Sequence, residues 1–459
     1  ALPEWAEVLA HRCSFLFPLQ VRRTLLEATA FGVDRSIAFL QSRQEEVLAA
    51  GGMPPSAMAS LRLGTLRRER ASVSRARLLV EADALFAAHA RRRTVLEVVF
   101  RGEGGSGLGV TSEFYSRVAE ELCLVAENDR VPCWLPNEEG AKGRSTLGVL
   151  FPRPLPPGDP SAPAVAARLR FLGRFVGKVL LDRHVVSLPL SPQFLALVLG
   201  HALPASALAV VFPGMRQVLT PLLTYCEQRH TIATDAGLSE AERESALKAL
   251  RLPDGGDVED ALLTFVSPIT GTPLCEGGEE RDVRAENVEE FMSLLSEWLL
   301  DRSVRVQVEA FREGLSEVIP WRRLRMFSPQ EVRYLLCGDE EVTWDEQSLL
   351  EHLLPEHGYT TDSPTIRFLV DVLVELPTRR RREFLQFCTG CPHLPPGGLA
   401  QLQPPLKVNL KDVHPADAAL PSARTCFHQV HLPPYSSRAI LRERLLFAIS
   451  NSKGLIDFT

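Results

Sequence analysis

The sequence predicts an α+β fold that is mostly helical, and three observations support this prediction. Hydrophobic residues make up 45% and charged residues 24% of the 459-residue chain, which is typical of a soluble globular protein with two to four domains. Apolar residues recur at helical spacing over most of the chain. Only short runs favour strands, at residues 95–100, 262–266 and 426–432.

Charge and cysteine content limit the partners and the compartment. The formal net charge of −6 argues against broad affinity for nucleic acid. Nine scattered cysteines, an odd number, favour free thiols in a reducing compartment, so we expect a cytoplasmic or nuclear protein. Residues 1–5 lack Met and a basic-then-apolar start; no signal peptide is predicted, and the sequence is compatible with a piece of a longer chain.

Helix signals recur along the chain. Several predicted helices open with an N-cap residue that is followed by Pro or, three residues later, by Glu. The arginines at 67–70 are interpreted as a solvated helix face, and residues 151–163 as a surface loop. The predicted helices are 5–17, 21–40, 73–89, 111–123, 171–181, one after Ser191, 239–250, and those opened by Asn287, Ser328, Thr343, Ser363 and Ser437.

A glycine-rich loop follows the strand predicted at 95–100. Gly102, Gly104 and Gly107 satisfy G-x-G-x-x-G between this strand and the next helix, and Glu127 follows at about the distance of a ribose-binding acid. The pattern predicts a dinucleotide site. No regular alternation of strands and helices follows it, so this site is an alternative and not the favoured interpretation.

The stretch 194–215 carries no Asp, Glu, Lys or Arg and is long enough to cross a bilayer. Gly200, Pro204 and Pro213 interrupt it. Because proline breaks a continuous helix, two short buried helices are favoured over a membrane span, and no membrane partner is expected.

Cys388 and Cys391 form C-x-x-C, which is compatible with a redox pair or with half of a zinc site. No second C-x-x-C completes four ligands, and His393 is too near in sequence to help. We therefore predict no metal and no cofactor. The arginines at 379–382 are interpreted as a solvated run.

Cys426 lies where a proline-flanked loop gives way to alternating residues. On a strand, Cys426, His428, Val430 and Leu432 would share one face. Arg424 and His428 would favour the thiolate form of Cys426, which is the nucleophile. A structural cysteine is the alternative interpretation.

The residues around Cys426 resemble a known active-site signature. The run L-P-S-A-R-T-C-F at 420–427, with L-P-P-Y-S-S behind it, resembles that of HECT-type ubiquitin-protein ligases. L-Q-F-x-T-G at 385–390 and L-P-P-G-G-L at 394–399 resemble further motifs of the family. The resemblance covers roughly 66–459. The sequences of several stretches are similar to those of the subgroup that acts on ubiquitin-fusion substrates.

Three positions depart from the family pattern. Arg424 stands where many members have His, and His428 stands where Asn usually follows Cys-Phe. The tail also lacks Phe at the fourth position from the end. The nucleophile is unaffected by these differences, but they bear on its environment and on which tail residue acts.

The resemblance implies a bilobal HECT fold. Its N-lobe is large and mostly helical and contains a small subdomain that binds the conjugating enzyme, while its C-lobe is smaller and α/β. The implied parts are a helical segment at 1–65 with a Gly-Pro break at 51–55, the N-lobe at 66–354 with its subdomain at about 217–305, a hinge at 355–359 and the C-lobe at 360–459.

The resemblance also implies a function. Cys426 would accept ubiquitin from a conjugating enzyme as a thioester and pass it to a substrate lysine. A catalytically inactive scaffold that only binds partners is the alternative. The implied site comprises Cys426 with its neighbours Arg424, Thr425, Phe427 and His428, the groove residues Phe291, Leu295 and Leu250, the hinge residues Pro355 and Gly358, and the tail residues Leu455, Ile456, Asp457 and Phe458.

Overall fold

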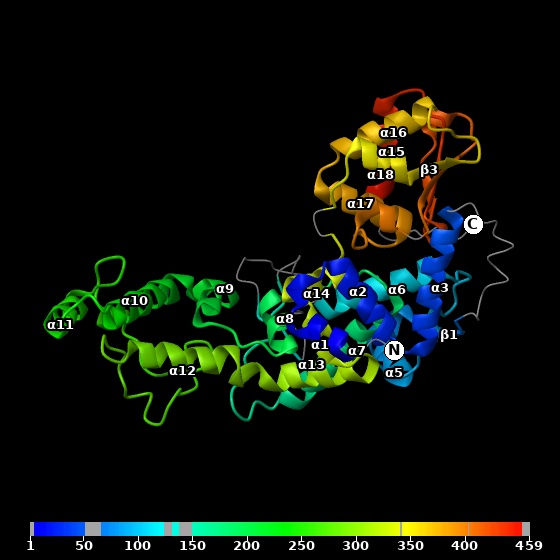
Figure 1. Ribbon diagram of the computed structural model, residues 1–459. Coiled ribbons are helices and arrows are strands. Elements are labelled where there is room, and N and C mark those ends of the chain that lie inside the picture. Colours follow the sequence, from blue (N-terminus) through cyan, green and yellow to red (C-terminus); the bar gives the residue numbers. More distant parts are fainter. Residues whose placement is uncertain are drawn as a thin grey trace. The chain divides into compact units, whose positions relative to one another are not determined.

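The fold is mixed α+β, mostly helical, with two small sheets (Figure 1). The computed structural model describes residues 4–50, 66–123, 131–136, 149–339, 342–402 and 404–451. The chain divides into two compact units. One comprises 1–124, 171–189 and 314–459, and the other comprises 125–170 and 190–313. The predicted α+β class is confirmed.

The N-terminal part is helical as predicted, but it forms three helices in place of the predicted two: α1 (Glu4–Arg12), α2 (Leu19–Thr29) and α3 (Val33–Ala50). The helix predicted at 21–40 is interrupted between Thr29 and Val33. Two buried arginines tie them to later parts of the same unit. Arg22 donates to the carboxylate of Glu331 at 2.6 Å, and Arg35 to that of Asp182 at 2.5 Å. Burying a charge is costly unless it is paired, so these pairs indicate that the helices are integral to the unit. The break at 51–55 lies outside the described residues.

A two-stranded parallel sheet follows, formed by β1 (Arg68–Val73) and β2 (Val95–Phe100). Two elements flank β2 in sequence, α5 (Leu78–His89) and α6 (Leu108–Cys123). The interpretation of the arginines at 67–70 as a helix face is wrong, and so is the helix start at residue 73. Val73 is 2% exposed and pairs with Phe100, so a period of two governs this stretch.

Gly177 allows close packing of α7 (Ala162–Asp182). A Cβ on Gly177 would lie 2.7 Å from Cβ of Val318, at the end of α13 (Arg305–Val318). α14 (Pro329–Cys337) begins with the expected capping box of Ser328 and Glu331. Aromatic rings fill the core beside α7, with Phe86 and Phe175 edge to face at 5.7 Å.

The second unit holds α8 (Pro192–Leu199), α9 (Leu208–Val211), α10 (Arg216–Thr234), α11 (Glu240–Ala249) and α12 (Val288–Leu300), the last three labelled at the left of Figure 1. The capping box of Ser239 and Glu242 opens α11 as expected. The strand predicted at 262–266 is absent from this part of the structure. Leu262 has a left-handed backbone with φ 48°, and only isolated bridges involve Thr264 and Val266.

The uncharged stretch at 194–215 is divided between α8 and α9, which confirms the predicted break. Among the described residues no single helix is long and apolar enough to span a bilayer. Two helical segments at 205–211 and 213–234, with a bend of 111° between them, meet that test only when taken together, by length and composition. The stretch 151–163 differs from the expected surface loop because Phe151 and Leu155 are buried.

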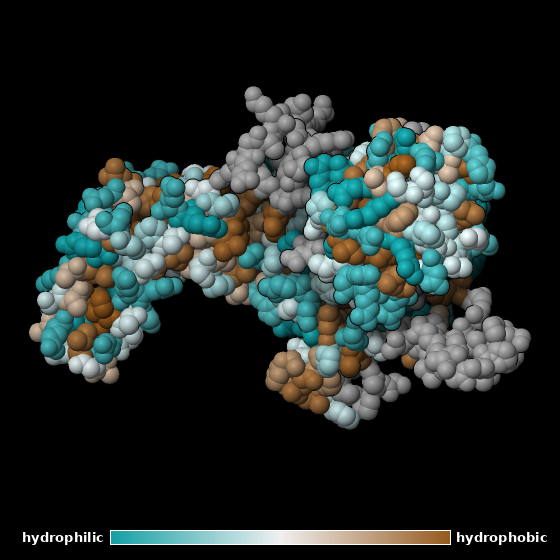
Figure 2. Space-filling view, turned by 90° about the horizontal axis from the view of Figure 1, so that it is seen from above, coloured by the Kyte–Doolittle hydropathy of each residue, from teal (hydrophilic) through white to brown (hydrophobic). Residues whose placement is uncertain are grey.

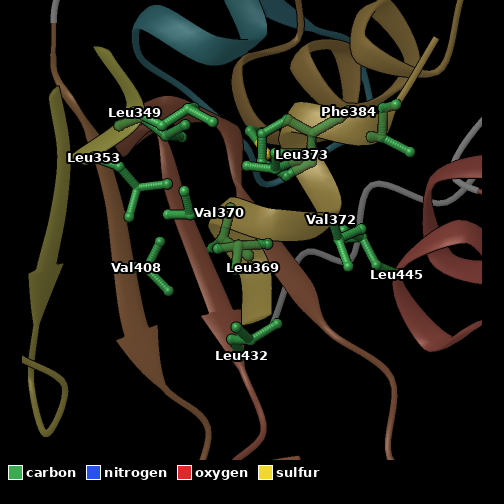
Figure 3. Packing of buried hydrophobic residues seen from close by; sticks show 14 of the residues in the cluster. Leu349, Leu353, Leu369, Val370, Val372, Leu373, Phe384, Val408, Leu432 and Leu445 are labelled. Carbon is green, nitrogen blue, oxygen red and sulfur yellow. The ribbon is translucent and has the colours of Figure 1, made fainter. Parts of the chain in front are cut away.

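The C-terminal part of the first unit has its own core (Figure 3). Its four-stranded sheet has the order β3-β4-β6-β5, with β5 antiparallel to β6 and the other pairs parallel. The elements are α15 (Glu346–His352), β3 (Leu353–Glu356), α16 (Pro364–Glu375), α17 (Thr378–Thr389), β4 (Leu406–Leu410), β5 (Ser422–Arg424), β6 (Gln429–Leu432) and α18 (Arg438–Asn451).

This core begins before the boundary that the sequence predicted. Val342, Trp344 and Leu349 belong to it, so α15 packs with the elements that follow. The helix expected from Thr343 starts at Glu346 with Asp345 as its N-cap, because Trp344 is buried and donates its indole N–H to the carbonyl of Leu373 at 2.9 Å.

Candidate active site

Cys426 lies in a tight turn at the end of a hairpin. The turn at 425–428, here called the Cys426 turn, connects β5 to β6, and Arg424 pairs with Gln429 at its base. The prediction that Cys426 and His428 share one face of a strand is wrong. His428 has φ 51°, which interrupts extended backbone, so the strand starts at Gln429.

His428 is buried at one end of this turn. Its side chain is 8% exposed, and its Nδ1 lies 2.5 Å from the carbonyl oxygen of Pro404. Burial lowers the pKa of His428 below its usual value, which favours the neutral ring. A neutral imidazole supplies no positive charge, so the expected help of His428 in forming a thiolate is not supported.

Arg424 and Phe427 are the members of this group that face solvent. Arg424 is exposed, and Phe427 is 58% exposed although it is a large apolar residue. Thr425 is partly buried and accepts a 3.4 Å hydrogen bond from the backbone N–H of His428. Arg424 and Phe427 therefore provide a cation and an aromatic ring on either side of Cys426 in sequence.

The hairpin rests on a fully apolar layer. Val408 of β4 and Val430 and Leu432 of β6 are each 0% exposed, and Figure 3 shows Val408 and Leu432 among the packed core residues. Ser437 accepts from the backbone N–H of Ile440 at 3.4 Å and opens α18, as predicted. Because this layer is close-packed, the strands that carry the turn are held in one arrangement.

The expected groove residues in the second unit are buried. Phe291 is 1% and Leu295 0% exposed, and Phe291 packs edge to face on Phe265 at 5.6 Å. They are core residues of this part, and Leu250 is half-buried; that these three residues belong to the groove for the conjugating enzyme stays a prediction. The apolar residues that reach the surface here are others, above all Leu262 at 90% exposure. Brown patches interrupt the teal surface of this part in Figure 2.

The segment expected to be a hinge begins within the C-terminal sheet and continues into the turn after β3. Pro355 lies in β3 opposite Val408. Gly358 has φ 105°, and a Cβ there would lie 2.9 Å from Cδ2 of Leu410. Tyr359 donates its hydroxyl hydrogen to the carbonyl of Leu432 at 2.9 Å. The segment 355–359 is thus in contact with β4 and β6, and its role as a hinge stays a prediction. The tail residues Leu455, Ile456, Asp457 and Phe458 lie outside the described residues.

The glycine-rich loop lacks the surroundings of a nucleotide site. Arg75 binds the carboxylates of both Glu103 and Glu113, which therefore lie close together near the start of α6. Two carboxylates there disfavour phosphate, which binds helix N-termini as an anion. The adjoining sheet has only the strands β1 and β2 in the described structure. Glu127 lies outside the described residues.

The C-x-x-C pair consists of shielded thiols. Burial raises the pKa of Cys388 well above its usual value and that of Cys391 to about 11. The Cys391 thiol donates to the carbonyl of Val185 at 3.2 Å. Within the described residues no three His, Cys, Asp or Glu side chains gather in a group that could hold a metal ion.

Comparison with known proteins identifies relatives over nearly the whole chain. The HECT-domain (ubiquitin-transferase) family model matches residues 122–456. The chain is 37% identical to E3 ubiquitin-protein ligase hecd-1 of Caenorhabditis elegans over 99% of this chain and 19% of that protein. It is 34% identical to E3 ubiquitin-protein ligase UPL3 of Arabidopsis thaliana (100% and 26%) and 31% identical to E3 ubiquitin-protein ligase Ufd4 of Drosophila melanogaster (99% and 20%). The chain thus spans between 19% and 26% of the length of these three relatives.

Proposed function

This chain belongs to the HECT-domain (ubiquitin-transferase) family, and we propose that it is a ubiquitin-protein ligase that uses Cys426. Its partners are ubiquitin, a ubiquitin-conjugating enzyme and substrate proteins that offer a lysine. The observation that carries this proposal is the position of Cys426, in a tight turn at the end of a hairpin and flanked by solvent-exposed residues. Such a turn leaves room for a large donor protein to approach.

In the first step, the Cys426 thiolate attacks the carbonyl carbon of the thioester that joins ubiquitin to the conjugating enzyme. The bond from that carbon to the donor sulfur breaks, and the donor cysteine leaves as a thiolate. One thioester replaces another, so positioning matters more than acid–base catalysis. Arg424 is exposed two residues before Cys426, and its charge favours the thiolate.

In the second step, the neutral amine of a substrate lysine attacks the Cys426 thioester. An isopeptide bond forms, the C–S bond breaks, and Cys426 leaves as a thiolate while the amine loses a proton. One of the tail residues Leu455, Ile456 and Phe458 acts in this step, and Asp457 orients the lysine. This assignment rests on the family resemblance.

The separate hydrophobic core of the C-terminal part supports a bilobal arrangement. The C-terminal core from Val342 to Ile449 forms the lobe that carries Cys426. The connection between lobes precedes the C-terminal core, which begins at Val342, since Pro355 and Glu356 belong to β3. The helices α10, α11 and α12 form the small subdomain that receives the conjugating enzyme, and exposed Leu262 contributes to the contact surface in place of buried Phe291.

Free cysteines among the described residues support a cytoplasmic or nuclear location.

The experiment is a non-reducing gel after the chain is mixed with activating enzyme, conjugating enzyme, ATP and ubiquitin. We expect a ubiquitin adduct that thiol reagents remove. Cys426→Ala should lose the adduct, and Cys426→Ser should form an oxygen ester that resists thiols. Cys275→Ala is the control, because Cys275 is a free and partly exposed cysteine of the second unit. An adduct that survives in Cys426→Ala would refute the assignment, and no adduct with the unmodified chain would favour an inactive scaffold.

A further inference from the structure

His428 has a backbone conformation that few side chains adopt. Its φ of 51° and ψ of 44° lie in the left-handed region, directly after the 3-10 turn at Thr425–Phe427. For residues other than Gly this region is disfavoured, although Asn, Asp and His enter it more readily than most. The chain reverses direction at this residue and enters β6, so His428 sets the angle at which the Cys426 turn leaves the sheet.

Two hydrogen bonds connect His428 to β4 and to Pro404, which precedes that strand. The ring Nδ1 lies 2.5 Å from the carbonyl oxygen of Pro404, and the carbonyl oxygen of His428 accepts from the backbone N–H of Lys407 at 2.8 Å. A carbonyl oxygen can only accept, so Nδ1 carries the hydrogen. The side chain thus acts as a donor in the neutral and the protonated ring alike.

These bonds join the turn to a fixed part of the core. Lys407 pairs with Gln429 in the parallel ladder of β4 and β6, and Val408 beside it is 0% exposed. The ring of His428 is itself 8% exposed. A buried side chain with one donor bond to a neighbouring loop holds the backbone next to Cys426 against the sheet.

We propose that His428 is a positioning residue for Cys426, which acts through backbone geometry and not through charge. The inference rests on the proposed function and deepens it. Transfer of ubiquitin between two thiols needs the attacking sulfur to be aligned with a carbonyl on a separate protein. Loss of the ring contact therefore slows loading without changing the acidity of the Cys426 thiol.

Three variants separate the backbone from the side chain. His428→Asn keeps a residue that tolerates left-handed φ and an amide N–H that can donate to Pro404. His428→Gly keeps the backbone conformation without strain but removes the donor. His428→Ala removes the donor and adds strain. The Gly variant is the decisive one if the Ala variant fails to fold, and a thermal melt accompanies each.

The first measurement is single-turnover loading from a ubiquitin-charged conjugating enzyme that loads the unmodified chain. We expect His428→Gly and His428→Ala to load about tenfold to a hundredfold more slowly, as for displaced reacting groups. His428→Asn should recover most of the rate. The reduction should appear at saturating conjugating enzyme, because binding of that partner does not involve His428.

The second measurement is the rate of Cys426 alkylation by iodoacetamide as a function of pH, followed on the Cys426 peptide by mass spectrometry. The midpoint of this profile reports the pKa of the thiol. Positioning predicts the same midpoint in all variants. A midpoint that rises together with the loss of loading would overturn the proposal in favour of an electrostatic role, and wild-type loading by His428→Gly would overturn it as well. Failure of the unmodified chain to load would instead reject the proposed function.

Discussion

The Cys426 turn and helix α12 differ in what they offer to another protein. Phe427 in the turn is 58% exposed, whereas Phe291 and Leu295 on α12 are 1% and 0% exposed. Both regions hold residues that the sequence assigned to contact with partners. A residue in an exposed turn can be changed with little loss of packing, whereas a buried aromatic residue supports its surroundings first. The two regions should therefore respond to substitution in opposite ways.

The largest effect is expected at the turn. Cys426→Ala should reduce ubiquitination of substrates to background, because the thioester cannot form without the sulfur. Its melting temperature should stay close to that of the unmodified chain. Ligation assays and a thermal melt on the same preparation check both parts. Ligation at the normal rate would show that Cys426 is not the acceptor, and a large fall in melting temperature would show that the turn is structural.

Removal of residues 455–459 should separate loading from transfer. The shortened chain should charge Cys426 normally but fail to discharge ubiquitin to lysine, if the tail acts in the second step as the family resemblance implies. A single-turnover chase with free lysine measures the discharge. Single changes to Ala at Leu455, Ile456 and Phe458 identify the active position. Discharge at the full rate by the shortened chain would remove the tail from the mechanism.

Phe291→Ala tests the other side of the comparison. Truncation of a fully buried Phe should lower the free energy of unfolding by about 3–5 kcal/mol. Leu262→Ala is the matched control, since Leu262 is 90% exposed in the same unit and should change stability by less than about 0.5 kcal/mol. Leu262→Ala should instead weaken binding of the conjugating enzyme. Urea unfolding and a binding titration on both variants decide whether Phe291 supports the core or contacts the conjugating enzyme. If Phe291→Ala weakens binding and leaves stability unchanged, Phe291 belongs to the contact surface.

Local signals in the sequence predicted local structure well. Ser239, Ser328 and Ser437 open helices as expected, since a cap and its partner lie within three residues of each other. The site was less predictable. The burial of Phe291 could not be read from spacing, because a core stripe and a binding stripe have the same period. The orientation of His428 depends on Pro404, which is 24 residues away in sequence.

His184, which lies outside the Cys426 turn and α12, should make stability depend on pH, with an effect smaller than that of Phe291→Ala. His184 stacks on Tyr115 with ring centroids 4.2 Å apart, and desolvation lowers the pKa of His184 to about 4. Asp182 opposes this shift, and the charges of Arg35 and Lys178 add to it. The unfolded chain therefore binds a proton near pH 6.5 that the folded chain takes up only near pH 4.

Stability from His184 is thus complete above about pH 6.5 and is lost as the pH falls toward 4. We expect a loss of about 1–3 kcal/mol over this window. His184→Phe keeps an aromatic ring on Tyr115 and removes the titrating group, so its unfolding free energy should vary less with pH. Urea unfolding at several pH values measures the difference. Parallel curves for the two proteins would show that His184 does not cause the dependence.

Gly358 extends the comparison to the turn that follows β3, a strand of the sheet that supports the Cys426 turn. Its φ of 105° disfavours any other residue, and an added Cβ would meet Cδ2 of Leu410 at 2.9 Å. Gly358→Ala should therefore lower the free energy of unfolding by about 1–3 kcal/mol. Gly398→Ala is the control, because Gly398 has φ 73° with no atom within 4 Å and should show only the backbone strain. Urea unfolding measures both losses. Unchanged stability with slower loading of Cys426 would instead support a hinge at 355–359.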